Sequence, residues 1–300
     1  MGCGGWSLTM KKFAVVFVTI FIFGLVGHAE TDYERGINKW RTAHQDELLA
    51  DGGWLTVAGL FWLKDGVNTV GSGGVYDIQL TDNFKKGKFG EIVFSGGKAQ
   101  LNIAPGVEAK SGGKIITEAD LTSDEKTKPN TIEVGSQTFY LIKRGERYGI
   151  RLKDTKSPAR TNFDGLKWFP VNPKYEVTAE LEPYPQPKEV NVPNVLGGTF
   201  PYKSPGILKF KLGRKEYRLQ PVIEDDHLFI IFRDLTSKTS TYGAGRFLYA
   251  DAPKDGKVVL DFNKAENPPC AFTAFATCPL PPQQNRLEVA INAGEKRYHK

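Results

Sequence analysis

The stretch that decides the fold class is TIEVGSQTFYLIKRGERYGIRLK, residues 131–153. It contains extended runs at residues 131–134, 137–143 and 148–153, and the small turn Gly135-Ser136 separates the first two. A link this short joins antiparallel neighbours, because parallel strands need a crossover of a dozen or more residues. The stretch therefore predicts antiparallel strands.

Similar runs, divided by turn signals, continue on both sides of this stretch. The 32 glycines and 18 prolines suit many short links better than long helices. Further strands are predicted at residues 54–63, 68–70, 75–80, 91–94, 99–103, 175–181, 207–212, 216–223, 227–233, 246–250, 257–262 and 286–291. The chain is therefore predicted to be mainly β, with two antiparallel β-sandwich or barrel-like units and a short N-terminal helix.

The helix is expected at residues 33–49, before the first strand. Apolar and aromatic side chains recur there at spacings of three and four, which places them on one stripe of a helix. The stripe consists of Ile37, Trp40, His44 and Leu48. Asp51-Gly52-Gly53 follows, and glycines at this position end a helix.

Chain breakers gather between Asp154 and Tyr175, where Ser157-Pro158, Asp164-Gly165 and Asn172-Pro173 occur. Such a concentration marks a connection between two halves. The sequence therefore predicts a signal peptide with an N-terminal extension at residues 1–29, a helical lead-in at 30–53, a β-sandwich at 54–154 and a β-rich C-terminal domain at 155–300.

Export is predicted from the N-terminal segment. Lys11 and Lys12 precede an unbroken apolar run at residues 13–26, and Gly27-His28-Ala29 offers the small residues that a signal peptidase reads. The run is shorter than the ~20 residues that usually span a membrane. We therefore expect cleavage after Ala29, a secreted or periplasmic product, and no stable membrane span after cleavage.

Charge and motifs exclude several common function classes. The formal net charge is +6, but basic and acidic residues are interleaved, so nucleic acid is not an expected partner. The chain lacks a phosphate-binding loop, a Gly-x-Ser-x-Gly motif, a His-Glu-x-x-His motif and a dinucleotide fingerprint. We expect no cofactor and no metal, and the sequence does not decide whether the protein is an enzyme.

Cys270 and Cys278 would be the cysteines of the exported protein, in a segment rich in proline. A disulfide is the simplest interpretation in an oxidising compartment. The alternatives are two reduced buried thiols, or a thiol that binds a metal or acts in catalysis.

Polar residues concentrate between Arg233 and Arg286, at strand ends and in loops. The candidate ligand-binding residues there are Arg233, Asp234, Tyr242, Arg246, Asp261, Asn263, Asn267 and Arg286. Loops on a rigid sheet often carry binding sites. The alternative is that these residues cap strand ends and pair with one another, so catalytic residues stay unknown.

A rival hypothesis makes the protein a hydrolase that works without histidine. Asp234, Asp251 or Asp261 would serve as acid or base, while Arg246 and Tyr242 would hold the substrate.

A second candidate region lies at the junction of the two halves. Alternation places Arg151 and Lys153 on one face of a strand, where a solvated sheet edge is the simplest interpretation. The sharper alternative is an aromatic and cationic groove that also uses Trp168, Phe169 and nearby tyrosines.

Residues Asn68 to Leu80 resemble the opening of a forkhead-associated domain, a β-sandwich that reads phosphothreonine. Ser72 stands where that family usually has arginine, and no histidine occurs between His44 and His227. The resemblance implies a forkhead-associated-like fold without the phosphothreonine-binding residues.

A broader resemblance runs from Trp40 to the C-terminus. The segments that carry it are Trp54 to Leu63, Thr241 to Leu248, Asp261 to Ala265, Asn267 to Cys270 and Cys278 to Pro282. They resemble the bacterial and archaeal domain-of-unknown-function family 1684 (DUF1684), which implies no activity. We expect a non-catalytic protein that binds a small polar ligand, a glycan or a protein partner.

Overall fold

The structure is a computed structural model that describes residues 1–5, 30–125 and 127–298. The apolar run and the small residues of the predicted signal peptide lie outside the described residues. The chain divides into two units, Met1–Thr31 and Asp32–Lys300, and the second contains all the elements below. Within the described residues, no helix is long and apolar enough to cross a membrane.

The predicted helix is confirmed as α1 (Asp32–Leu49). Ile37 and Leu48 of the predicted stripe are buried. The carboxylates of Asp32 and Glu34 in the first turn interact favourably with the positive end of the helix dipole. The turn after the helix needs glycine at position 53, because an added Cβ would lie 2.2 Å from the carbonyl oxygen of Leu48.

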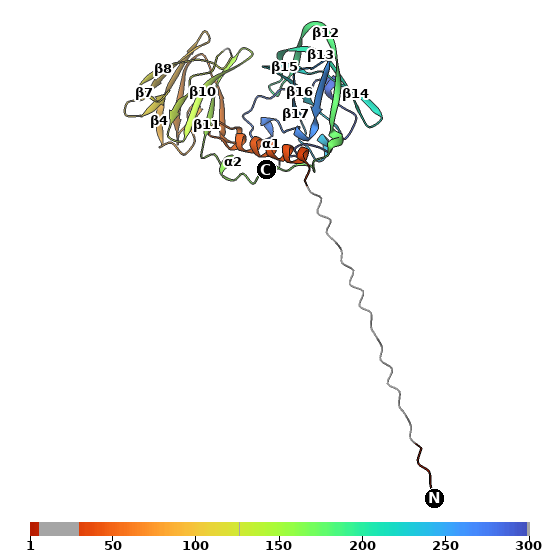
Figure 1. Ribbon diagram of the computed structural model, residues 1–300. Coiled ribbons are helices and arrows are strands. Elements are labelled where there is room, and N and C mark those ends of the chain that lie inside the picture. Colours follow the sequence, from red (N-terminus) through yellow and green to blue (C-terminus); the bar gives the residue numbers. More distant parts are fainter. Residues whose placement is uncertain (6–29, 126, 299–300) are drawn as a thin grey trace. The chain divides into compact units, whose positions relative to one another are not determined.

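The first eleven strands form a β-sandwich, at the left in Figure 1. They are β1 (Val57–Trp62), β2 (Gly66–Ser72), β3 (Ile78–Gln79), β4 (Gly87–Ser95), β5 (Lys98–Ile103), β6 (Ala109–Ser111), β7 (Lys114–Ile116), β8 (Glu118–Leu121), β9 (Ile132–Val134), β10 (Gln137–Arg144) and β11 (Arg147–Asp154). One sheet has the order β1-β11-β10-β9-β6-β7, and the other has the order β3-β2-β4-β5-β8. Phe89, Leu101 and Phe139 are fully buried in the core between them.

The pairings within residues 131–153 agree with the sequence. Val134 pairs with Gln137 across the Gly135-Ser136 turn, and β10 pairs with β11 in antiparallel register. Almost every strand pair of the described chain is antiparallel, with β2 and β3 as the parallel exception. The predicted fold class, mainly β with antiparallel sandwich-like units and an N-terminal helix, is confirmed.

The later strands form two further sheets. They are β12 (Glu176–Pro193), β13 (Thr199–Leu212), β14 (Lys215–Leu219), β15 (Val222–Glu224), β16 (His227–Phe232), β17 (Arg246–Asp251) and β18 (Lys257–Asp261). Their orders are β14-β13-β12-β18 and β15-β16-β17. Phe262 packs against both Phe210 and Phe232 in the core that the two sheets share.

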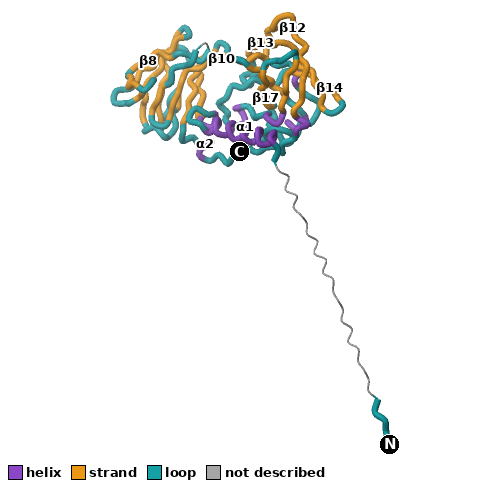
Figure 2. Tube along the Cα trace, viewed as in Figure 1, coloured by secondary structure: helices purple, strands orange, loops and turns teal. Residues whose placement is uncertain are grey.

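Short helical segments punctuate the connections, and Figure 2 shows how small they are beside α1. They are η1 (Trp54–Thr56), α2 (Pro158–Thr161), η2 (Pro173–Tyr175), η3 (Leu235–Lys238), η4 (Phe262–Lys264), η5 (Pro269–Ala271) and η6 (Gln283–Asn285). The predicted domain boundary near residue 155 stays a prediction.

Several strands differ from those predicted. β12 and β13 pair far beyond the predicted runs, although the pairing is interrupted between Pro183 and Lys188, where prolines supply no backbone N–H. The predicted strand at 286–291 is wrong: its backbone makes a single bridge, between Arg233 and Arg286. The short strands β6 to β8, of three or four residues each, were not predicted.

Candidate functional site

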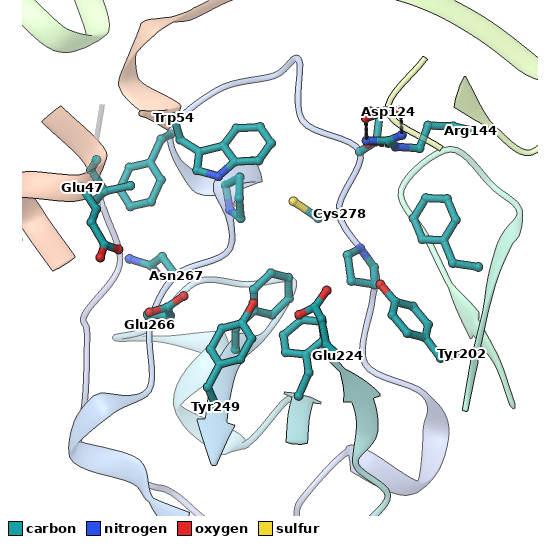
Figure 3. Close-up of a pocket in the computed structure, with 18 of the residues that line it drawn as sticks. Glu47, Trp54, Asp124, Arg144, Tyr202, Glu224, Tyr249, Glu266, Asn267 and Cys278 are labelled. Carbon is teal, nitrogen blue, oxygen red and sulfur yellow. Dashed lines mark hydrogen bonds and ion pairs between the residues drawn. The ribbon is translucent and has the colours of Figure 1, made fainter. Parts of the chain in front are cut away.

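A pocket of about 1060 Å³ lies against α1, and we call it the α1 pocket. Its walls come from α1 and η1, from the loops and strands around β10 and β11, and from the C-terminal sheets and their long connections (Figure 3). The lining residues used below are Trp40, His44, Trp54, Asp124, Arg144, Arg151, Tyr202, Glu224, Phe247, Tyr249, Glu266, Asn267, Thr277 and Cys278. The pocket therefore combines aromatic, acidic and cationic groups.

His44 lies between two carboxyl groups at one end of the pocket. Its Nδ1 lies 3.2 Å from Glu266 Oε2, and its Nε2 lies 3.7 Å from Glu295 Oε2. The His44 side chain is 10% exposed. Its ring stacks on Trp40 with centroids 5.3 Å apart, which fixes its orientation from the preceding turn of α1.

Glu266 and Glu295 are held in place by backbone contacts. Glu266 exchanges two backbone hydrogen bonds with Phe247 at the start of β17. Glu295 is buried and accepts hydrogen bonds from the backbone and side-chain nitrogens of Asn267, at 2.9 and 2.5 Å. The three acidic and basic groups thus have a defined geometry before any ligand enters.

The pKa values of this group depart from their ordinary values. Burial raises the pKa of Glu266 to about 7 against the opposing effect of His44, with the charge of Glu295 also raising it. Burial lowers the pKa of His44, but Glu295 and Glu266 outweigh this, so its pKa is raised. Glu266 therefore exchanges its proton near neutral pH.

A second acidic group lies beside tyrosines on the same side of the pocket. Glu224 ends β15, and its carboxyl group shares a hydrogen bond with the Tyr249 side chain of β17. Burial raises the pKa of Glu224, and burial together with the Glu224 charge raises the pKa of Tyr202 to about 12. In Figure 3 Glu224, Tyr249 and Glu266 lie together, across the cavity from Trp54.

The opposite wall is cationic. Arg144 donates to both carboxylate oxygens of Asp124, at 2.9 and 2.8 Å, and its Nε donates to the Thr277 hydroxyl at 3.0 Å. Arg151 is only 3% exposed and lies over the Trp54 ring, 5.2 Å from its centroid. The expected solvated sheet edge is wrong here, because β1 and β10 flank β11 on both sides.

Cys270 and Cys278 are free thiols in the structure, so the predicted disulfide is not shown. The backbone N–H of Cys270 donates to Cys278 Sγ at 3.2 Å, and the two side chains share a hydrogen bond. That shared hydrogen bond lowers the pKa of Cys270 and, with burial, raises the pKa of Cys278. Pairing of the two sulfurs in an oxidising compartment stays a prediction.

Most of the residues that line the α1 pocket lie in a segment that matches a known family model. Residues 161–296 match the family model of DUF1684, described as a protein of unknown function. The chain is also similar to an uncharacterized protein of Haloarcula marismortui solved by solution NMR, with 34% identity and a TM-score of 0.39, over 46% of this chain and 78% of that chain. No curated protein matches the chain. The forkhead-associated resemblance is not confirmed.

All eight candidate ligand-binding residues from the sequence fall within the DUF1684 segment, but only Asn267 lines the α1 pocket. Asp234 and Arg246 form a buried ion pair, with Arg246 Nη2 3.0 Å from Asp234 Oδ2. Asp234 also caps η3 and accepts from the backbone N–H of Ile291 at 2.8 Å. This pair fixes the connection after β16 to the C-terminal segment.

Asp261 and Asn263 belong to another internal network. Asp261 accepts a hydrogen bond from the Tyr33 hydroxyl at 2.9 Å and one from the Asn263 backbone at 3.1 Å. The Asn263 side chain donates to the carbonyl oxygen of Asn172 at 3.0 Å. These bonds tie α1 and the connection before β12 to the end of β18.

The remaining candidates do not converge on one cavity. Tyr242 donates to the carbonyl oxygen of Cys270 at 3.1 Å. Arg233 is half-buried, and Arg286 is exposed. Asp251, from the hydrolase hypothesis, is exposed at the end of β17. The Tyr242 contact holds a loop, in agreement with the alternative that the sequence left open.

The sequence offered weak signals for the residues that do line the pocket. His44 was a titratable residue on an otherwise apolar helix stripe. Glu266 was the one residue between two segments that resemble the family, Asp261 to Ala265 and Asn267 to Cys270. Glu224 falls in the three-residue link between the predicted strands at 216–223 and 227–233. Among the residues that the structure describes, no group of His, Cys, Asp and Glu has the geometry to hold a metal ion.

Proposed function

We propose that the α1 pocket binds a small polyhydroxylated ligand of the glycan type without chemically changing it. The observation that carries the proposal is the pairing of aromatic rings with carboxyl groups across one cavity: Trp54 faces Tyr249 and Glu224. The pocket volume lies just above the range of roughly 300–1,000 Å³ that is typical of small-molecule sites. The space suits one or two sugar rings.

The chemistry of the lining fits a ligand with an apolar face and hydroxyl edges. Aromatic rings bury the carbon-bound face of a sugar, while carboxylates accept hydrogen bonds from its hydroxyl groups. Glu224 and Glu266 provide such acceptors, and the protonated form of Glu266 can instead donate to a ligand oxygen. Because these groups are already fixed by neighbours, little side-chain conformational freedom is lost on binding.

The rival function is hydrolysis by carboxylic acids, and the pKa of Glu266 favours it. A carboxyl group with a pKa of about 7 is suited to donate a proton near neutral pH. The acids in this version are Glu266 and Glu224, since Asp234 and Asp261 are engaged in internal networks away from the pocket. A binding experiment that also detects reaction products distinguishes the two functions.

We expect Trp54→Ala to weaken saccharide binding by roughly tenfold, because the ring supplies the stacking face. Titration calorimetry of the protein from residue 30 onward against a panel of mono- and disaccharides measures this. Trp62→Ala is the matched control, since Trp62 stacks on Arg147 and does not line the pocket. If no saccharide of the panel binds, the proposal is refuted. If new products form from a disaccharide, hydrolysis is favoured.

We also propose that the protein is exported, on the basic and apolar pattern of residues 11–29. The mature chain is then expected to begin at Glu30, two residues before α1. Mass spectrometry of the N-terminus of protein purified from its native cell measures this. Recovery of intact chains that begin at Met1, in a cytosolic fraction, would contradict export.

A further inference from the structure

Arg151 is a buried cation without a counter-ion. It is 3% exposed, lies on β11 between β1 and β10, and lines the α1 pocket. Among the described residues, no carboxylate lies within ion-pair distance of it. Its Nη2 donates to the Thr277 hydroxyl at 3.3 Å, and its Nε is buried without a hydrogen-bond partner.

Arg246 shows how the same chain pairs the charge of a buried arginine that serves only the fold, although its Nε is likewise buried without a hydrogen-bond partner. Its guanidinium meets the carboxylate of Asp234 and the backbone carbonyl oxygens of Ile291 and Ala293. Arg151 has the same charge, since arginine stays protonated in proteins, and it makes one hydrogen bond to a neutral hydroxyl. A buried charge left in this state costs free energy unless a partner arrives from outside the chain.

Two contacts around Arg151 leave hydrogen-bond donors without a partner in the chain. The Thr277 hydroxyl accepts hydrogen bonds from both Arg144 and Arg151, so its own proton is available to a ligand oxygen. The Trp54 ring covers one face of the guanidinium, which leaves its nitrogen edge for contacts. Arg144 is already paired with Asp124, whereas the Arg151 guanidinium still has N–H groups that can donate to a ligand.

We propose that Arg151 and Thr277 form a subsite for an oxyanion, a carboxylate or phosphate group carried by the pocket's ligand. The planar fork of a guanidinium matches both groups in two parallel hydrogen bonds. The inference rests on the proposed function and narrows it: the ligand is an acidic sugar or sugar phosphate, with its anion at Arg151 and its hydroxyl groups toward Glu224 and Glu266.

The first experiment uses small anions and does not depend on the sugar. Acetate and inorganic phosphate, each compared with sodium chloride at equal ionic strength, are expected to raise the melting temperature of the unmodified protein. Arg151→Met is expected to lose this response, while Arg218→Met, an exposed arginine on β14, keeps it. An equal response in Arg151→Met, or none in the unmodified protein, would overturn the subsite.

The second experiment needs no variant and uses glucose, glucuronate and glucose 6-phosphate, which differ at a single carbon. Glucuronate, glucose 6-phosphate or both are expected to bind the unmodified protein at least about tenfold more tightly than glucose. The stronger of the two identifies carboxylate or phosphate as the preferred group. Equal binding of all three would refute the subsite and keep the proposed function. Failure of all three to bind, with anions still raising the melting temperature, would refute the sugar and keep the subsite.

Discussion

Replacing Arg246 with leucine is expected to lower the free energy of unfolding by about 3–5 kcal/mol. The Arg246 and Asp234 side chains are 1% and 0% exposed, and their ion pair is 3.0 Å long. Leucine would leave the Asp234 carboxylate buried without its cation, and two backbone carbonyl oxygens would lose a donor. Urea unfolding of the protein from residue 30 onward measures the change.

The control for this prediction is Arg218→Leu, which breaks an exposed ion pair with Glu182 on the same group of sheets. Exposed pairs contribute about 0–1 kcal/mol, so this variant should unfold close to the unmodified protein. If the two leucine variants lose similar stability, the Arg246–Asp234 pair does not hold the C-terminal segment in place. The polar residues of this region would then need another role.

Local patterns in the sequence were sufficient to predict the fold class. The Gly135-Ser136 turn and the runs beside it are short-range features, and the structure pairs them as antiparallel neighbours. The pairing of β12 with β13 through several prolines was not predictable in this way. It depends on the partner strand, which tolerates an interruption between Pro183 and Lys188.

The pocket was less predictable, because it depends on contacts between distant residues. Arg151 and Thr277 are 126 positions apart, and nothing local to either one signals the other. The candidate residues Asp234 and Arg246 were correctly identified as unusual polar groups near strand ends. Their side chains bind each other and nearby backbone groups. A sequence alone does not reveal which way a polar side chain points.

The stability of the protein is expected to fall as the pH rises from about 4.5 to about 7, and Glu266 is the main cause. Burial raises the pKa of Glu266 from 4.5 to about 7, so the folded chain binds more protons than the unfolded chain in this window. Each pKa unit is worth roughly 1.4 kcal/mol, which makes the loss on the order of 3 kcal/mol. Glu224 acts in the same direction, since burial raises its pKa as well, and His44 does so above its ordinary pKa of 6.5.

Glu266→Gln keeps the shape of the side chain and removes its titration, so it is expected to remove most of this slope in urea unfolding at several pH values. Glu146→Gln, an exposed residue in the turn after β10, should leave the slope unchanged. A slope that survives in Glu266→Gln would assign the titration to another group. If the slope is lost, Glu266 changes from hydrogen-bond donor to acceptor across this pH range, and saccharide binding in the α1 pocket should depend on pH in the same interval.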